Sequence, residues 1–127
     1  NVQGNHKAAL PLFQQALDID MALRGPNHPT VAIRWNNLGD AYRGLGQYDK
    51  AEAFLTKALN SDRATFGENH PKVILRYFNL ARVYEAQGDT AKARDAYTKA
   101  LQLLRQVDPD DAAQIRYFEE KLRTLEG

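Results

Sequence analysis

The feature that most constrains the fold of this chain is a repeat with a period of 42 residues. His28-Pro29 returns as His70-Pro71, and Gly4, Gly46 and Gly88 fall on the same spacing. Self-similarity at a fixed period of about 20 to 50 residues is typical of repeat architectures, in which each unit packs on its neighbours. The period therefore predicts one structural unit that is used several times.

Each unit contains two stretches with the apolar spacing of an α-helix. In the first stretch, Val31, Trp35 and Leu38 lie at i, i+4 and i+7, as one helical face requires. The second stretch follows a short glycine-containing break and is rich in alanine, which lets helix axes approach closely. Each unit is therefore predicted to be an antiparallel helical hairpin. The matched positions are Val31 with Val73, Arg34 with Arg76, Trp35 with Tyr77, Leu38 with Leu80, Tyr42 with Tyr84, Ala51 with Ala93, Leu55 with Tyr97, Ala58 with Ala100 and Leu59 with Leu101.

Glycine and proline mark the ends of the predicted helices. Second helices are expected to end near Leu23, Thr65 and Val107, and glycine follows the first two as a left-handed C-terminal cap. The next helices restart at His28-Pro29 and His70-Pro71, because proline suits a first helical position and histidine can accept a hydrogen bond from an exposed amide. Pro11 lies inside the first predicted helix, where it is tolerated if that helix begins only about one turn earlier, at the cost of a slight kink.

The two ends of the array are predicted to differ. The last segment, 110–126, is expected to be a capping helix with Phe118 on its apolar face. At the other end, Leu10, Phe13 and Leu17 predict an exposed apolar stripe and self-association. The expected organisation is a single domain over 1–127, from a longer protein, with the second helix of a truncated repeat at 4–24, full repeats at 28–66 and 70–107, and the cap at 110–126.

Composition excludes several function classes. The chain holds 17 basic and 16 acidic residues, with a net charge of +1 and the two signs interspersed, which argues against a nucleic-acid binder. No apolar run approaches the roughly 18 to 20 residues of a membrane span, so no membrane role is expected. Cysteine is absent, which excludes a disulfide framework and favours a cytoplasmic location.

The repeat resembles the tetratricopeptide repeat signature of an aromatic residue, Leu-Gly, Tyr, Gly, Tyr and Ala. The residues that carry it are Trp35, Leu38-Gly39, Tyr42, Gly46, Tyr48, Ala51, Leu55 and Ala58-Leu59, and they are matched again by Tyr77, Leu80-Ala81, Tyr84, Gly88, Ala93, Tyr97 and Ala100-Leu101. Ordinary repeats of this family have about 34 residues, so the longer unit resembles the subclass typified by kinesin light chains. Thr90 departs from the usual tyrosine, and the third repeat keeps only Leu122.

This resemblance implies an all-α, right-handed superhelical solenoid of about two full repeats, a half repeat at the N-terminus and a C-terminal capping helix. It also implies a concave groove that binds a peptide or protein segment, with no cofactor, no metal and no catalytic residue. Asn37 and Asn79 are the first candidates, because an amide can both donate to and accept from a peptide backbone. The positions implied to face the groove are Ile33, Asn36, Asn37, Asp40, Arg43, Leu75, Phe78, Asn79, Arg82, Glu85, Tyr117, Glu120 and Lys121.

Each candidate has a simpler alternative. Asn37 and Asn79 can cap or bridge helices. Arg43 and Arg82 can grip a carboxylate, or each can pair with an acid three residues away on its own helix. Phe78 and Tyr117 can form a pocket or belong to an interhelical core. His28 and His70 lack the further ligands of a metal site, and Ser61 and Thr65 have no histidine nearby in sequence, so catalysis is not expected.

Three functional hypotheses remain open from the sequence. The first is a scaffold module that captures a peptide or protein segment in the groove. The second is a structural module that assembles homo-oligomers through its N-terminal end. The third is a regulatory segment of a larger signalling protein.

Overall fold

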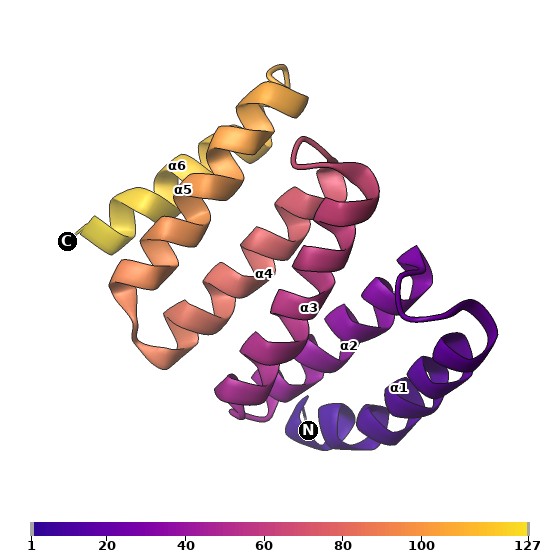
Figure 1. Ribbon diagram of the computed structural model, residues 1–127. Coiled ribbons are helices and arrows are strands. Elements are labelled where there is room, and N and C mark those ends of the chain that lie inside the picture. The colour runs from indigo at the N-terminus through magenta and orange to yellow at the C-terminus, as the bar shows by residue number, and fades with distance from the viewer. Residues whose placement is uncertain (1, 127) are drawn as a thin grey trace. The chain divides into compact units, whose positions relative to one another are not determined.

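Six α-helices make up the described part of the chain, residues 2–126 of the computed structural model (Figure 1). They are α1 (Val2–Arg24), α2 (Pro29–Gly44), α3 (Tyr48–Phe66), α4 (Pro71–Gln87), α5 (Thr90–Val107) and α6 (Ala112–Glu126). The chain divides into two compact units, Asn1–Thr65 and Phe66–Gly127. The first contains α1, α2 and nearly all of α3, and the second contains α4, α5 and α6. The all-α class and the helical hairpins predicted from the sequence are confirmed.

The predicted helix boundaries are confirmed to within about one residue where histidine and glycine set them. The Nδ1 atoms of His28 and His70 accept hydrogen bonds from the amides of Thr30 and Lys72, each at 3.1 Å. These bonds satisfy donors that the first turn of a helix leaves free. Gly25 and Gly67 follow α1 and α3 with φ of 84° and 85°, a left-handed conformation that costs glycine little.

The start of α1 differs from the sequence prediction. The helix begins at Val2, and Pro11 lies inside it, well beyond the first turn. Proline removes one amide donor from the helix interior and crowds the preceding turn. The chain nevertheless stays helical on both sides of Pro11, so the apolar residues and alanines before and after it keep one helical register.

The first unit is built around the contact between α1 and α2. Leu17, Val31 and Leu38 are its buried centre, and Leu10 and Phe13 pack against them. The expectation that Leu10, Phe13 and Leu17 form an exposed stripe is therefore wrong, because these side chains face α2. The exposed apolar residues of α1 lie elsewhere on the helix: Leu12, Ile19, Met21 and Leu23.

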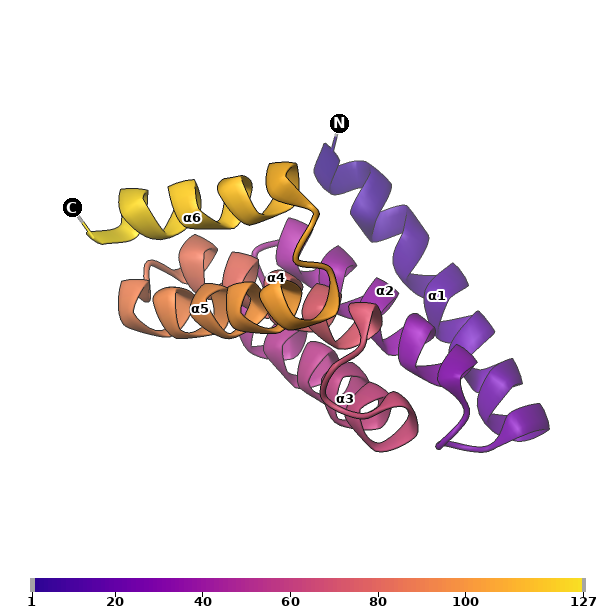
Figure 2. The same cartoon turned by 90° about the horizontal axis from the view of Figure 1, so that it is seen from above.

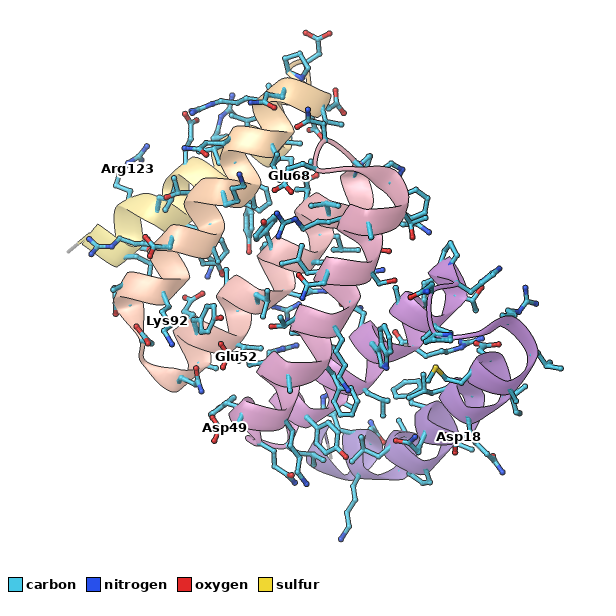
Figure 3. All side chains as sticks on the ribbon, in the orientation of Figure 1. Asp18, Asp49, Glu52, Glu68, Lys92 and Arg123 are labelled. Carbon is cyan, nitrogen blue, oxygen red and sulfur yellow. The ribbon has the colours of Figure 1, made fainter. Side chains whose placement is uncertain are left out.

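In the second unit α4 packs on α5 and α5 packs on α6, and Figures 1 and 2 show these helices side by side. Tyr97 of α5 and Phe118 of α6 are buried at the centre of this unit. Polar contacts lie at both ends of the α4/α5 hairpin. Glu68, just before α4, lies 3.5 Å from Lys99 Nζ of α5, and at the other end Lys92 Nζ lies 5.6 Å from the Tyr84 ring centroid; Glu68 and Lys92 are labelled in Figure 3. The side chain of Arg123 points outward from α6 (Figure 3).

Candidate functional site

The second unit contains an apolar pocket of about 270 Å³. Leu75 and Phe78 come from the exposed side of α4, Leu104 and Val107 from the end of α5, and Phe118 from α6. The pocket forms at this place because the end of α5 and the start of α6 meet the first turns of α4. Its complete lining is Pro71, Ile74, Leu75, Phe78, Leu104, Val107, Asp108, Asp111, Gln114 and Phe118.

Aromatic contacts hold the pocket wall in place. The Phe78 ring centroid lies 5.9 Å from that of Tyr97, 6.1 Å from that of Tyr117 and 5.5 Å from that of Phe118. Separations of about 4.5 to 7 Å with tilted planes are favourable for aromatic pairs. Phe78 is therefore both part of the interhelical core and part of the pocket wall, so the two alternatives left by the sequence are both realised.

Two residues of the pocket occupy positions where the repeat elsewhere carries a charged pair. Leu104 is two periods after Asp20, and Phe118 is two periods after Arg34. In the first unit Arg34 Nε lies 2.8 Å from Asp20 Oδ2, and the Asp20 side chain is only 10% exposed. The intermediate period has Asp62 and Arg76 at these positions, and both are buried. Replacement of the charged pair by leucine and phenylalanine makes this pocket apolar.

A polar cluster lies on the other part of α4. Glu85 accepts a hydrogen bond from the Tyr97 hydroxyl at 2.7 Å, and its Oε2 atom lies 3.2 Å from Lys121 Nζ. Burial, and next the hydrogen bond to the Glu85 carboxylate, raise the pKa of Tyr97 above its ordinary value. The cluster links α4 to both α5 and α6. Lys121 also lines a second hollow of about 210 Å³ with Tyr117, Glu120 and Thr124.

The candidate groove residues of the second unit fall into an exposed set and a buried set. Leu75 and Tyr117 are each 46% exposed, and Arg82 lies with its guanidinium carbon 5.7 Å from the Phe78 ring centroid. Arg82 thus stacks on an aromatic ring, while Glu85 is engaged by Tyr97 and Lys121. Asn79 is only 7% exposed and so offers little surface to a ligand.

The candidates of the first unit lie on α2. Asn36, Asn37, Asp40 and Arg43 are all half-buried. Arg43 Nη2 lies 2.7 Å from Asp40 Oδ1, which is the intrahelical pairing that the sequence left as an alternative to ligand binding. Ile33, at the position that corresponds to Leu75, is 37% exposed. Asn36 of α2 stands where α4 has Phe78, so this face of α2 is more polar than the corresponding face of α4.

The sequence did not point to Leu104, Val107, Asp108 or Asp111 as site residues. A signal was present, because leucine at 104 interrupts a series that has aspartate at 20 and 62. Within the part of the chain that the structure describes, no group of three or more metal-ligating side chains comes together. Nor is any helix in that part long and apolar enough to span a membrane.

The sequence profile of the tetratricopeptide repeat matches residues 1–64 and again residues 35–106. The chain belongs to the tetratricopeptide repeat family. The fold of this tetratricopeptide repeat protein is also found in solved structures. A search of curated proteins gave no match.

Two crystal structures illustrate the likeness. BtubC (BKLC) from P. vanneervenii is 23% identical with a TM-score of 0.88, and the match covers 96% of this chain and 49% of that protein. A kinesin light chain candidate from Podosopora anserina, with nearly identical TPR-like repeats, is 20% identical with a TM-score of 0.84. That match covers 96% of this chain and 58% of the Podosopora protein. The chain thus spans about half the length of these relatives. Its fold is like that of these kinesin-light-chain-like repeats, and repeats of the tetratricopeptide family generally mediate protein–protein interactions.

Proposed function

We propose that this tetratricopeptide repeat protein binds a peptide or protein segment on the face of the second unit that carries Leu75, Phe78 and Tyr117. One observation carries the proposal: an apolar pocket opens beside Leu75, a large apolar side chain that is 46% exposed. Exposed apolar side chains around a preformed hollow are the usual anchor points of a partner. Arg82 and Lys121 lie close enough to this face to provide polar contacts.

The role of the asparagines and of the α2 face stays a prediction. Since Asn79 is buried, the proposal depends on the exposed apolar residues and treats Asn79 as a support for α4. Asn36, Asn37, Asp40 and Arg43 remain candidates for additional contacts. The family is typically non-enzymatic, and a binding role requires no cofactor.

Selection of short random peptides displayed on phage tests this proposal. We expect peptides that bind the wild-type chain to lose binding to Leu75→Glu, because a carboxylate at the pocket edge cannot be buried beside apolar groups without a large free-energy cost. The matched control is Ile33→Glu, which changes the corresponding position of α2. Circular dichroism verifies that both variants fold. Peptides that bind the wild type and Leu75→Glu equally would contradict the proposal.

The exposed face of α1 supports a second candidate function, association of two copies of the chain. Leu12, Ile19 and Leu23 are 65%, 55% and 75% exposed and share one side of the helix. The positions two periods later than the first two are Ala96 and Leu103 of α5, which are 8% and 3% exposed. The same face of the repeat is therefore covered in α5 and uncovered in α1.

Light scattering coupled to size-exclusion chromatography tests the second candidate. We expect the average mass to rise with protein concentration in the wild type and to stay at that of a monomer in Leu12→Glu/Ile19→Glu. Leu75→Glu is the control, because it adds a charge to the other unit. A wild-type monomer at every concentration would exclude self-association. The third hypothesis, a regulatory segment of a larger signalling protein, remains a prediction from the sequence.

A further inference from the structure

The size and lining of the pocket in the second unit suit one large apolar side chain. Its volume of about 270 Å³ lies just below the range of roughly 300 to 1,000 Å³ that is typical of small-molecule and cofactor sites. The walls are formed by Ile74, Leu75 and Phe78 on one side and by Leu104 and Val107 on the other. A partner that inserts a single aliphatic or aromatic residue would therefore fill this hollow.

The charges at the pocket edge are all of one sign. Asp108 and Asp111 are the charged residues in its lining, and no ion pair joins either carboxylate to a basic side chain among the described residues. Asp111 Oδ1 accepts a hydrogen bond from the Gln114 amide at 3.1 Å, which caps the N-terminus of α6. That bond comes from a neutral amide and supplies no opposite charge, so the edge of the pocket attracts a basic group of a ligand.

The end of α5 adds to this attraction. α5 ends at Val107, which lines the pocket, and Asp108 follows as its C-cap residue. The last turn of a helix carries a partial negative charge from carbonyl groups without intrahelical partners. A basic group of a ligand would therefore meet the carboxylate of Asp108 and the negative end of α5 at the same place.

We infer that this pocket selects a peptide segment in which a large apolar side chain is flanked by a lysine or an arginine. The inference rests on the proposed function and adds the chemistry of the partner. The apolar residue occupies the space between α4 and the end of α5. The neighbouring basic residue reaches Asp108 and Asp111, where charge complementarity favours it over an acidic residue.

The composition of the peptides selected on phage is the first test. We expect peptides that depend on Leu75 to carry lysine or arginine within one or two positions of an apolar residue. Peptides that depend on Leu75 but have acidic or neutral flanks would overturn the inference and leave the proposed function in place. Absence of any Leu75-dependent peptide would overturn both.

A charge-removing variant is the second test, measured by fluorescence anisotropy with one selected peptide. Asp108→Asn/Asp111→Asn keeps the shape of the edge, and asparagine still caps α6. We expect affinity to fall about threefold to tenfold at low salt, because each exposed charge pair contributes up to about 1 kcal/mol.

Two controls accompany that measurement. Asp95→Asn on the exposed side of α5 removes a charge twelve residues before Val107, about 18 Å along the helix at a rise of about 1.5 Å per residue, and should leave affinity unchanged. Added salt should reduce the wild-type affinity toward that of the double variant. Equal affinity of wild type and double variant at low salt would overturn the inference.

Discussion

The junction between α1 and α2 and the junction between α5 and α6 use the same two repeat positions in opposite ways. In the first unit, Asp20 and Arg34 form an ion pair with 2.8 Å between Oδ2 and Nε. In the second, Leu104 and Phe118 are buried with 6% and 1% exposure. Both junctions join the second helix of one hairpin to the first helix of the next. The comparison shows that two α-helices can meet at these repeat positions through either an ion pair or an apolar contact.

The difference has a functional side. The Asp20–Arg34 pair is partly buried, and the attraction between its charges is largely offset by their desolvation. The leucine and phenylalanine of the second unit leave an apolar wall, and this wall lines the pocket. The proposed binding face therefore lies where the array departs from its own pattern.

A second pair of repeat positions also differs between the two units, although both units carry charged residues there. Asp40 and Arg43 of α2 correspond to Arg82 and Glu85 of α4, so the two signs are exchanged. In α2 the two charges bind each other at 2.7 Å. In α4 Arg82 stacks on Phe78, while Glu85 contacts Tyr97 and Lys121. Glu85 thus connects α4 to α5 and α6, whereas Arg82 and the two charges of α2 make contacts within their own helices.

The largest expected effect comes from truncation of the apolar junction. Phe118→Ala removes a ring that is 1% exposed, and we expect it to lower the free energy of unfolding by about 3 to 5 kcal/mol. Urea unfolding followed by circular dichroism measures the loss. Tyr117→Ala, at the exposed neighbouring position, is the control and should cost much less. A loss below about 1 kcal/mol for Phe118→Ala would contradict the assignment of this ring to the junction core.

The polar junction should be sensitive to the loss of one partner and tolerant of the loss of both. Arg34→Met leaves Arg24, with its Nε 3.8 Å from Asp20 Oδ1, as the remaining basic partner of this carboxylate among the described residues. We expect a cost of about 1 to 3 kcal/mol. Asp20→Leu/Arg34→Phe transplants the apolar pair of the second unit, and its stability should return to within about 1 kcal/mol of wild type. Urea titrations of both variants provide the comparison. A double variant less stable than Arg34→Met would show that the two junctions are not interchangeable.

The second unit should lose stability at alkaline pH through its buried Tyr97. The first unit has Leu55 at the corresponding position, and leucine does not titrate. The raised pKa of Tyr97 means that the folded state keeps its proton more firmly than the unfolded state. The resulting stability is complete below the ordinary pKa of about 10 and declines above it by up to about 1.4 kcal/mol per pH unit. Thermal unfolding of wild type and Tyr97→Phe as a function of pH measures this contribution. The same alkaline slope in both proteins would refute it, and Tyr48→Phe serves as the control.

The smallest effects concern the exchanged charges. We expect Glu85→Gln to cost about 1 kcal/mol, because it weakens contacts to two other helices. Arg43→Gln breaks an intrahelical surface pair and should cost less than about 0.5 kcal/mol. Parallel urea titrations compare the two. Equal losses would show that bridging between helices gives Glu85 no special role.

The hairpins and their boundaries could be predicted from the sequence because local chemistry determines them. The 42-residue period fixes the register, and histidine caps and left-handed glycines act within a few residues of their own positions. Tertiary contacts determine the features that the sequence prediction missed. Whether Leu17 faces α2 or solvent depends on the rotation of α1, and the long helix through Pro11 leaves Leu12 and Ile19 on the exposed side instead.

The candidate site could be predicted in part. Leu75, Phe78 and Tyr117 lie on one face, as expected from α4 and α6, but the opposite wall comes from the end of α5. A prediction based on the first helix of each hairpin could not find Leu104 or Val107. The burial of Asn79 depends on how tightly α4 packs, which the residue type does not reveal.

The pair Asp20–Arg34 also restricts the order in which hairpins can follow one another. A second helix with aspartate at this position needs a first helix with arginine, and one with leucine needs an apolar ring. If α6 followed α1, the carboxylate of Asp20 would face Phe118 in place of Arg34, and we expect the same penalty of about 1 to 3 kcal/mol as for Arg34→Met. An exchange of repeats by recombination would meet the same penalty. At the α1/α2 and α5/α6 joints, single residues thus determine which helix can follow, even though the hairpins themselves look alike.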